Sequence, residues 1–177
     1  MNFRNSIFFI LCIPFMVSCA TWQQRTSAFQ SAVSQGEFEQ AGKILGKDKQ
    51  LNKDKNQILY YLNLGYVEFM QDNHEASNKA FETAERLTED QQRNLLSEAA
   101  VLVSNPEVRL YRPEDFEVIM INFYKALNYL KMDNMEGALV EVRKINIRLQ
   151  QLNDKYPSHK NRYQRDAFAH LLMGLIY

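Results

Sequence analysis

A dense group of charged and aromatic residues between positions 109 and 117 holds the side chains best suited to chemistry. Its members are Arg109, Tyr111, Arg112, Glu114, Asp115 and Glu117. An active site built from them would use a glutamate as acid or base and an arginine to hold an anionic substrate. The other interpretation is a helix N-terminus, in which Pro113 occupies the first turn and acidic residues stabilise the helix dipole. We favour the helix N-terminus, because no nucleophile or metal-ligand cluster accompanies the charges.

The three histidines show no metal-site pattern. His74, His159 and His170 have no carboxylate or second histidine at ligand spacing, such as the four-residue step of a zinc-binding helix. We expect surface or packing roles for them, and we expect no metal and no cofactor.

Cys19 has chemistry of its own because it ends an apolar run. The chain opens with a short basic segment around Arg4, and the apolar stretch from Ile7 to Val17 is too short to cross a bilayer comfortably. Small residues follow where cleavage would occur, and the chain turns polar from Thr21. This pattern predicts a secretory signal peptide over residues 1–18.

The tetrad Met16-Val17-Ser18-Cys19 resembles the bacterial lipobox. The resemblance implies that the thiol of Cys19 is acylated with diacylglycerol and that cleavage makes Cys19 the first residue of a lipid-anchored protein. Several acyl chains anchor a protein durably. Ala20 replaces the aspartate that holds many lipoproteins in the inner membrane, so the resemblance points to the outer membrane, facing the periplasm. Ordinary cleavage and an uncleaved anchor remain the alternatives.

Composition excludes several classes of protein. Cys12 leaves with the signal peptide and Cys19 is lipidated, so disulfides, Cys-ligated zinc and thiol catalysis are excluded. The 21 basic and 21 acidic residues are interspersed, which argues against a nucleic-acid partner. Only six Gly and four Pro occur, which favours long helices over β-hairpins.

A pattern of small and aromatic residues recurs along the chain. The first copy shows its turn at 36–41. In the second, the helix 59–69 carries Leu64-Gly65 and leads through a turn at 71–76 to Ala80-Phe81. The segments 123–130, 132–138 and 139–145 repeat this order as a third copy, and 167–177 begins a fourth. The pattern resembles the tetratricopeptide repeat of about 34 residues. The resemblance implies an all-α fold over residues 19–177, with antiparallel helix pairs stacked as a right-handed superhelix.

Small residues should mark the helix contacts, since helices packed closely need them. The positions are Gly65, Ala84, Ala126, Ala138 and Gly174. Ser77 stands where the second repeat would carry alanine, which leaves the register of that repeat open. The fourth copy lacks a second helix, so either the chain is a truncated product of a longer protein or 171–177 finds cover elsewhere.

The segments between repeats predict further elements. We expect a helix from Asp90 to Val103, ended by Pro106, and an apolar helix from about Val118. The residues 47–55 and 154–163 are expected as exposed connections. The stretch from Tyr111 to Leu130 also resembles a family of uncharacterised bacterial lipoproteins with tetratricopeptide-like repeats. That resemblance covers most of the chain after Trp22, and it brings no assigned reaction; the family's members tend to be longer.

These features favour binding over catalysis. The first helix of each tetratricopeptide-like pair lines a concave groove where peptides or partner helices dock. The residues placed there by the repeat are Leu62, Tyr66, Phe69, Met70, Phe123, Leu127, Leu130 and Lys131, although core packing is the competing role for each.

The sequence therefore predicts a non-enzymatic, lipid-anchored scaffold that holds an envelope protein or peptide during assembly, export or secretion. The alternative is the N-terminal part of an envelope enzyme whose active domain lies beyond residue 177. A glycan-binding protein is a further alternative, with the ligand held by Tyr111 and the nearby arginines.

Overall fold

The computed structural model describes residues 22–49, 51, 53–97, 110–156 and 167–177. The helices are α2 (Trp22–Ser34), α3 (Phe38–Lys47), the short 3-10 helix η2 (Asp54–Asn56), α4 (Gln57–Met70), α5 (His74–Ser97), α6 (Asp115–Lys131), α7 (Met135–Lys155) and α8 (Ala167–Ile176). No strand occurs among these residues, so the predicted all-α class is confirmed. The predicted signal peptide, Cys19, Arg109, His159 and the helix end after Ser97 lie outside the described residues.

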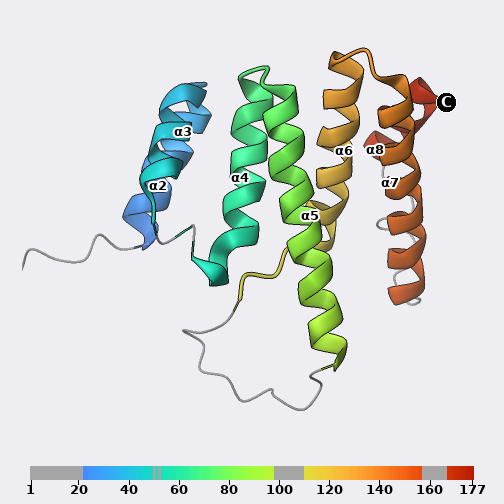
Figure 1. Cartoon of the computed structure of the whole chain (residues 1–177), viewed down its shortest axis with the longest axis horizontal. Helices are drawn as coiled ribbons and strands as arrows, with labels where there is room; N and C mark the ends of the chain where they lie inside the picture. Colours follow the sequence, from blue (N-terminus) through green and yellow to red (C-terminus); the bar gives the residue numbers. More distant parts are fainter. Residues whose placement is uncertain (1–21, 50, 52, 98–109, 157–166) are drawn as a thin grey trace, which may run out of the picture.

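The helices stand side by side in a row (Figure 1). Three antiparallel hairpins, α2–α3, α4–α5 and α6–α7, follow one another, and each packs against the next. The helix α8 packs against α7 at the end of the row. In the described part of the chain, no helix combines the length and the apolar character needed to cross a bilayer.

The three hairpin loops share one geometry. Each loop has three residues, and the middle one has a positive φ: 77° at Gly36, 58° at Asp72 and 55° at Asp133. The next backbone N–H donates to the carbonyl five residues back, in the bonds Glu37 to Ala32 (2.9 Å), Asn73 to Glu68 (2.9 Å) and Asn134 to Tyr129 (2.8 Å). A left-handed residue with this bond is a common way to end a helix. The three hairpins are therefore closed by the same kind of loop.

The shared loop fixes the register of the second hairpin, which the sequence leaves open. Ala41, Ser77 and Ala138 each stand five residues after the left-handed residue, and each is fully buried. Ser77 thus replaces alanine without any offset. Its hydroxyl donates to the Gly65 carbonyl at 2.8 Å, so the substitution adds a hydrogen bond between α4 and α5.

Small residues allow close helix contact where the repeat predicts it, with one exception. A Cβ at Gly65 would lie 2.8 Å from the Phe81 ring, and Ala84, Ala126 and Ala138 are fully buried. Gly174 is exposed, and nothing described lies within 4 Å of a Cβ there. The described residues therefore give no close contact at Gly174, where the repeat predicts one.

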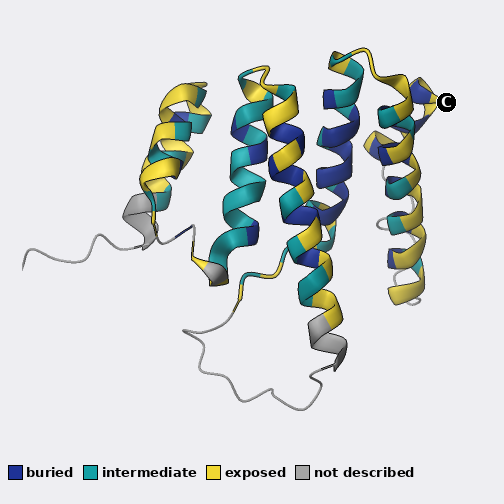
Figure 2. Cartoon of the chain, viewed as in Figure 1, coloured by how far each residue is buried: buried dark blue, intermediate teal, exposed yellow. Residues whose placement is uncertain are grey.

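The largest core cluster lies between α6, α7 and α8. Buried residues run along α6 and the facing sides of its neighbours (Figure 2). Ala169, Leu172, Met173 and Ile176 of α8 pack into this cluster. The other face of α8 leaves Phe168, Leu171, Leu175 and Tyr177 between 60% and 72% exposed.

One helix boundary and the burial of one residue differ from expectation. The helix α6 begins at Asp115 rather than near Val118, because the Glu117 carboxylate accepts the Glu114 backbone N–H at 2.7 Å and caps the helix start. The connection at 47–55 is exposed at its lysines, as expected, but Leu51 within it is only 5% exposed.

Gly65→Ala tests the close packing of α4 on α5. The added methyl group would press on Phe81, which is buried and stacked on Tyr124 at 5.5 Å. We expect a loss of about 1–3 kcal/mol in the free energy of unfolding. Gly46→Ala in α3 is the control: its Cβ meets nothing within 4 Å, so a neutral effect or a gain of about 0.5–1 kcal/mol is expected. Urea unfolding followed by circular dichroism measures both, and equal effects would contradict the packing.

Candidate binding site

The polar group at 109–117 supports the start of α6. The Tyr111 hydroxyl donates to the Glu117 carboxylate at 2.7 Å, and its backbone N–H donates to the Lys55 carbonyl at 2.7 Å. The Gln91 amide of α5 donates to the Tyr111 carbonyl at 3.0 Å. Burial, together with the Glu117 carboxylate, raises the pKa of Tyr111, so this hydroxyl stays a donor at neutral pH. Tyr111 therefore fastens the segment to η2, α5 and α6.

The structure describes two of the other three residues predicted as a polar cluster. Arg112 and Glu114 are exposed, and Arg109 lies outside the described residues. Of the four residues predicted as a polar cluster, the structure gives a bonded role to Tyr111 and places Glu114 at the N-cap of α6.

Most of the residues predicted to bind a partner pack between helices. Tyr66, Phe69 and Phe123 place their rings 5.9, 4.9 and 6.0 Å from that of Tyr124. Phe81 adds a fourth ring to Tyr124, which makes Tyr124 an aromatic centre that sequence reasoning missed. Little of Phe123 is available to a partner, because it is buried.

The remaining predicted positions divide between packing and exposure. Leu62 packs against the cluster that contains Phe81, and Leu127 and Leu130 pack against the core of α6 and α7. Met70 is 39% exposed and Lys131 is also exposed. The groove assignment of these eight residues stays a prediction.

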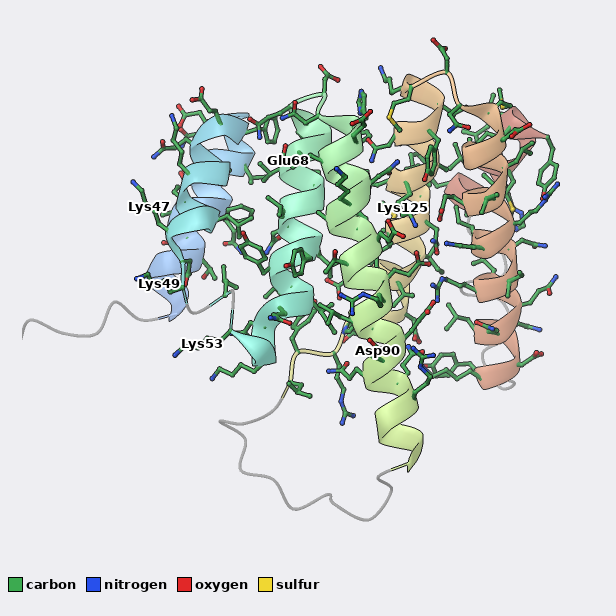
Figure 3. The ribbon with its side chains drawn as sticks, viewed as in Figure 1. Lys47, Lys49, Lys53, Glu68, Asp90 and Lys125 are labelled. Atoms are coloured by element: carbon green, nitrogen blue, oxygen red, sulfur yellow. The ribbon has the colours of Figure 1, made fainter. Side chains whose placement is uncertain are left out.

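A buried charge network that the sequence did not reveal joins α5, α6 and α7. Lys125 of α6, labelled in Figure 3, is 4% exposed and lies between two carboxylates. Its Nζ is 2.9 Å from Glu85 Oε2 of α5 and 3.0 Å from Glu141 Oε1 of α7. Both glutamates are buried as well, so three helices share one set of ion pairs.

Three more side chains complete this charge network. Asn122 donates to Glu85 at 2.9 Å and to Glu141 at 2.8 Å, and its own oxygen accepts from Arg148 Nε at 2.7 Å. Arg148 also reaches Glu85 at 2.7 Å, and Lys144 lies 3.3 Å from each glutamate. The charge network thus comprises Glu85, Asn122, Lys125, Glu141, Lys144 and Arg148.

Two members of the network, Glu85 and Lys125, have shifted pKa values that keep them charged near neutral pH. Burial alone would raise the pKa of the Glu85 carboxyl, but bonds from Asn122, Lys125 and Arg148 outweigh burial and lower its pKa to about 2. Burial likewise opposes the charge on Lys125, and the carboxylates of Glu141 and Glu85 outweigh it and raise the pKa. Neither group is poised to transfer protons, whereas both can hold a fixed electrostatic field.

A hollow of about 410 Å³ lies beside the charge network, where α5 and α7 run past the start of α6. We call it the α5–α6–α7 hollow, and its lining residues are Gln92, Asp115, Val118, Ile119, Arg148, Gln151, Leu152 and Lys155. The apolar residues of this lining are buried, while Gln92, Gln151 and Lys155 are exposed. Arg148 belongs to both the charge network and the lining of the hollow. Apolar surfaces with a few placed polar groups are typical of ligand sites of this size.

The rim of the hollow is held by its own polar contacts. Lys155 Nζ lies 3.0 Å from Asp115 Oδ1, and the Tyr156 hydroxyl donates to Asp115 Oδ2 at 2.8 Å. These contacts tie the end of α7 to the start of α6 and keep the hollow's walls together.

A second polar cluster ties α5 to α6 near the hairpin loops. The Asn128 amide donates to Ser77 Oγ at 2.8 Å and to Asn78 Oδ1 at 3.0 Å, and His74 Nδ1 lies 2.9 Å from Asn128 Oδ1. His74 therefore has a packing contact of the kind predicted. No group of three or more His, Cys, Asp or Glu suited to a metal ion occurs among the residues that the structure describes.

Comparison of the chain with protein families, curated proteins and solved structures finds no match. The functional argument therefore rests on the sequence motifs and on the geometry of the charge network and the hollow.

Glu85→Gln tests the charge network. The change removes one of the two buried carboxylates around Lys125 and leaves cationic groups with less compensation. We expect a loss of about 3 kcal/mol in unfolding free energy at pH 7, since breaking a buried ion pair costs about 3–5 kcal/mol. The control is Glu89→Gln: this side chain is 51% exposed and lies 3.3 Å from Arg148, so the loss should be under about 1 kcal/mol.

The same variant has a pH signature. Glu85 has a pKa of about 2 in the folded protein against an ordinary value of 4.5, so its stabilisation is complete above pH 4.5 and is lost as the pH falls toward 2. The wild type should therefore lose more stability than Glu85→Gln across this window. Parallel pH profiles of the two proteins in urea unfolding would contradict the lowered pKa.

Proposed function

We propose that this protein is a lipid-anchored helical-repeat scaffold of the bacterial cell envelope that binds a protein or peptide partner. The observation that carries the proposal is the row of three hairpins with identical loops, each packed on the next. Repeat proteins of this kind build extended binding surfaces by stacking one unit. The lipobox-like tetrad ending at Cys19 supplies the anchor and the location at the outer membrane.

The hairpin geometry supports a tetratricopeptide-like superhelix as the finer description of the fold. The same fully buried small position follows each loop, at Ala41, Ser77 and Ala138. The larger residue four positions later is buried in each copy as well, at Leu45, Phe81 and Val142. A small residue followed one turn later by a large one is the order that this repeat uses to pack its two helices.

The α5–α6–α7 hollow is the surface that we propose for the partner. Three helices supply its walls, and its polar contacts are already made within the protein, so a ligand meets a preformed shape. The apolar floor suits an aliphatic or aromatic side chain of the partner, and the exposed amides of Gln92 and Gln151 can bond its backbone.

The anchor is tested by the mass of the mature protein. The full chain is expressed in a Gram-negative host beside Cys19→Ala, and the membrane fraction is analysed by intact mass spectrometry. We expect a species that begins at Cys19 and carries diacylglycerol, and we expect the variant to lack it. An unmodified chain with a different N-terminus would contradict the lipid anchor and leave a secreted or periplasmic protein.

The partner surface is tested by filling the hollow. Gln151→Trp places a large ring at the rim, and Gln150→Trp, exposed on the same helix but outside the lining, is the matched control. Tagged proteins are cross-linked in intact cells, and captured partners are quantified by mass spectrometry. We expect at least a fivefold loss of a partner with Gln151→Trp and little change with Gln150→Trp. A partner kept by both variants would contradict binding at the hollow, and a bound glycan there would favour the glycan-binding alternative.

A further inference from the structure

Exposed lysines gather at one end of the first two hairpins. Lys47 ends α3, and the connection to α4 carries Lys49 and Lys53; all three are exposed. Figure 3 shows Lys49 and Lys53 toward that end of the molecule, with Lys47 above them on the outer side of α3. Lys55 follows in η2 and is also exposed. We call these four lysines the basic end. Four lysines therefore stand within the nine positions from 47 to 55, together with Asp48 and Asp54.

One of the two acidic residues of this connection, Asp48, is turned inward. Asp48 is half-buried, and its carboxylate accepts the Leu51 backbone N–H at 3.2 Å. Leu51 is itself buried at 5% exposure, which fastens the connection to the helices. The lysines therefore point outward while Asp48 serves the turn.

The opposite end of the same hairpins is acidic. Around the two tight loops lie Glu37, Glu39, Glu68, Asp72 and Glu75, and Figure 3 shows Glu68 toward the loop end of α4, away from Lys49 and Lys53. Lys43 is paired with Glu39 at 2.7 Å. The chain as a whole has a formal net charge of zero, so any electrostatic attraction depends on orientation. An anionic surface would attract the basic end and repel the loop end.

The basic end is also the end nearest the lipid anchor. The helix α2 starts at Trp22, and because α2 and α3 are antiparallel its start lies beside the end of α3 (Figure 1). Cys19 precedes Trp22 by three positions, a reach of about 10 Å for an extended chain. This step rests on the proposed acylation of Cys19. A bilayer holding that acyl chain lies within reach of the lysines, so it is the favoured anionic partner over soluble nucleic acid or an acidic protein.

We propose that the basic end docks on the anionic phospholipid headgroups of the membrane that holds the protein. The attraction is about 1 kcal/mol for each lysine near such a surface. Docking orients the row of hairpins, with the basic end at the bilayer and the acidic loops of the first two hairpins directed away from it.

Lysine labelling on vesicles tests the docking. The processed full chain is purified from membranes and reconstituted in vesicles of phosphatidylcholine alone or with phosphatidylglycerol, and the amines are acetylated and quantified by mass spectrometry. We expect several-fold slower labelling of Lys47, Lys49 and Lys53 on the anionic vesicles at low salt, with full recovery at 1 M salt, where screening acts over about 3 Å. The exposed Lys79 and Lys131 should label equally on both. Equal labelling of all sites, or protection by soluble DNA but not by vesicles, overturns the proposal.

Charge reversal separates this proposal from the anchor. The triple variant Lys47→Glu, Lys49→Glu, Lys53→Glu is compared with Lys79→Glu, Arg86→Glu, Arg143→Glu, which makes the same charge change at other exposed positions. Intact mass spectrometry first reports whether Cys19 is acylated. If it is, the first triple variant alone should lose the salt-sensitive protection of Lys55.

If Cys19 is not acylated, the anchor has failed but the docking is still measurable. The processed protein should then sediment with anionic vesicles, and the first triple variant should bind at least tenfold more weakly than the second. Equal binding by both triple variants overturns the docking, and equal binding of the wild type to phosphatidylcholine vesicles does so as well.

Discussion

The ion pairs of Lys125 hold the second half of the molecule together. An ammonium group that is 4% exposed is costly unless it is paired, and the two carboxylates that pair it come from α5 and α7. The position of α6 between those helices is therefore set by charge as well as by apolar packing. Arg148 extends the same bonds to the wall of the hollow, so the shape of the hollow depends on the charge network.

The repeat could be predicted from the sequence because its determinants are local. A three-residue loop with a left-handed residue, followed by a small buried residue, is visible at 36–41 and 132–138. The second hairpin was ambiguous because Ser77 replaces alanine; in the left-handed position, Asp72 and Asp133 both stand where the first loop has Gly36. Aspartate is among the non-glycine residues that tolerate the left-handed region best, and serine satisfies its hydroxyl on the Gly65 carbonyl. The structure needs the conformation and the small volume rather than the consensus residues.

The candidate site could not be predicted in this way, because its members are far apart in the sequence. Glu85 and Arg148 are in contact across 63 positions, and single charges on helices usually face water. One signal was present: Lys125 is the only charged residue between Val118 and Leu130, on a helix whose neighbouring positions are apolar. A lone charge within a buried stripe requires a buried partner. The sequence cannot say which glutamates provide it.

The alternation of helix direction explains why the proposed anchor and the proposed binding features lie on the side of the molecule opposite the tight loops. Each hairpin's first helix begins, and its second helix ends, at the end opposite the tight loops. The start of α2, the basic end and the residues that line the hollow all belong to that side, because the lining comes from the start of α6 and the later turns of α5 and α7. An acyl chain on Cys19 would therefore bring the bilayer to the same side as the hollow. A partner segment in the hollow would then meet the protein close to the membrane surface, which favours membrane-proximal chains over fully soluble ones.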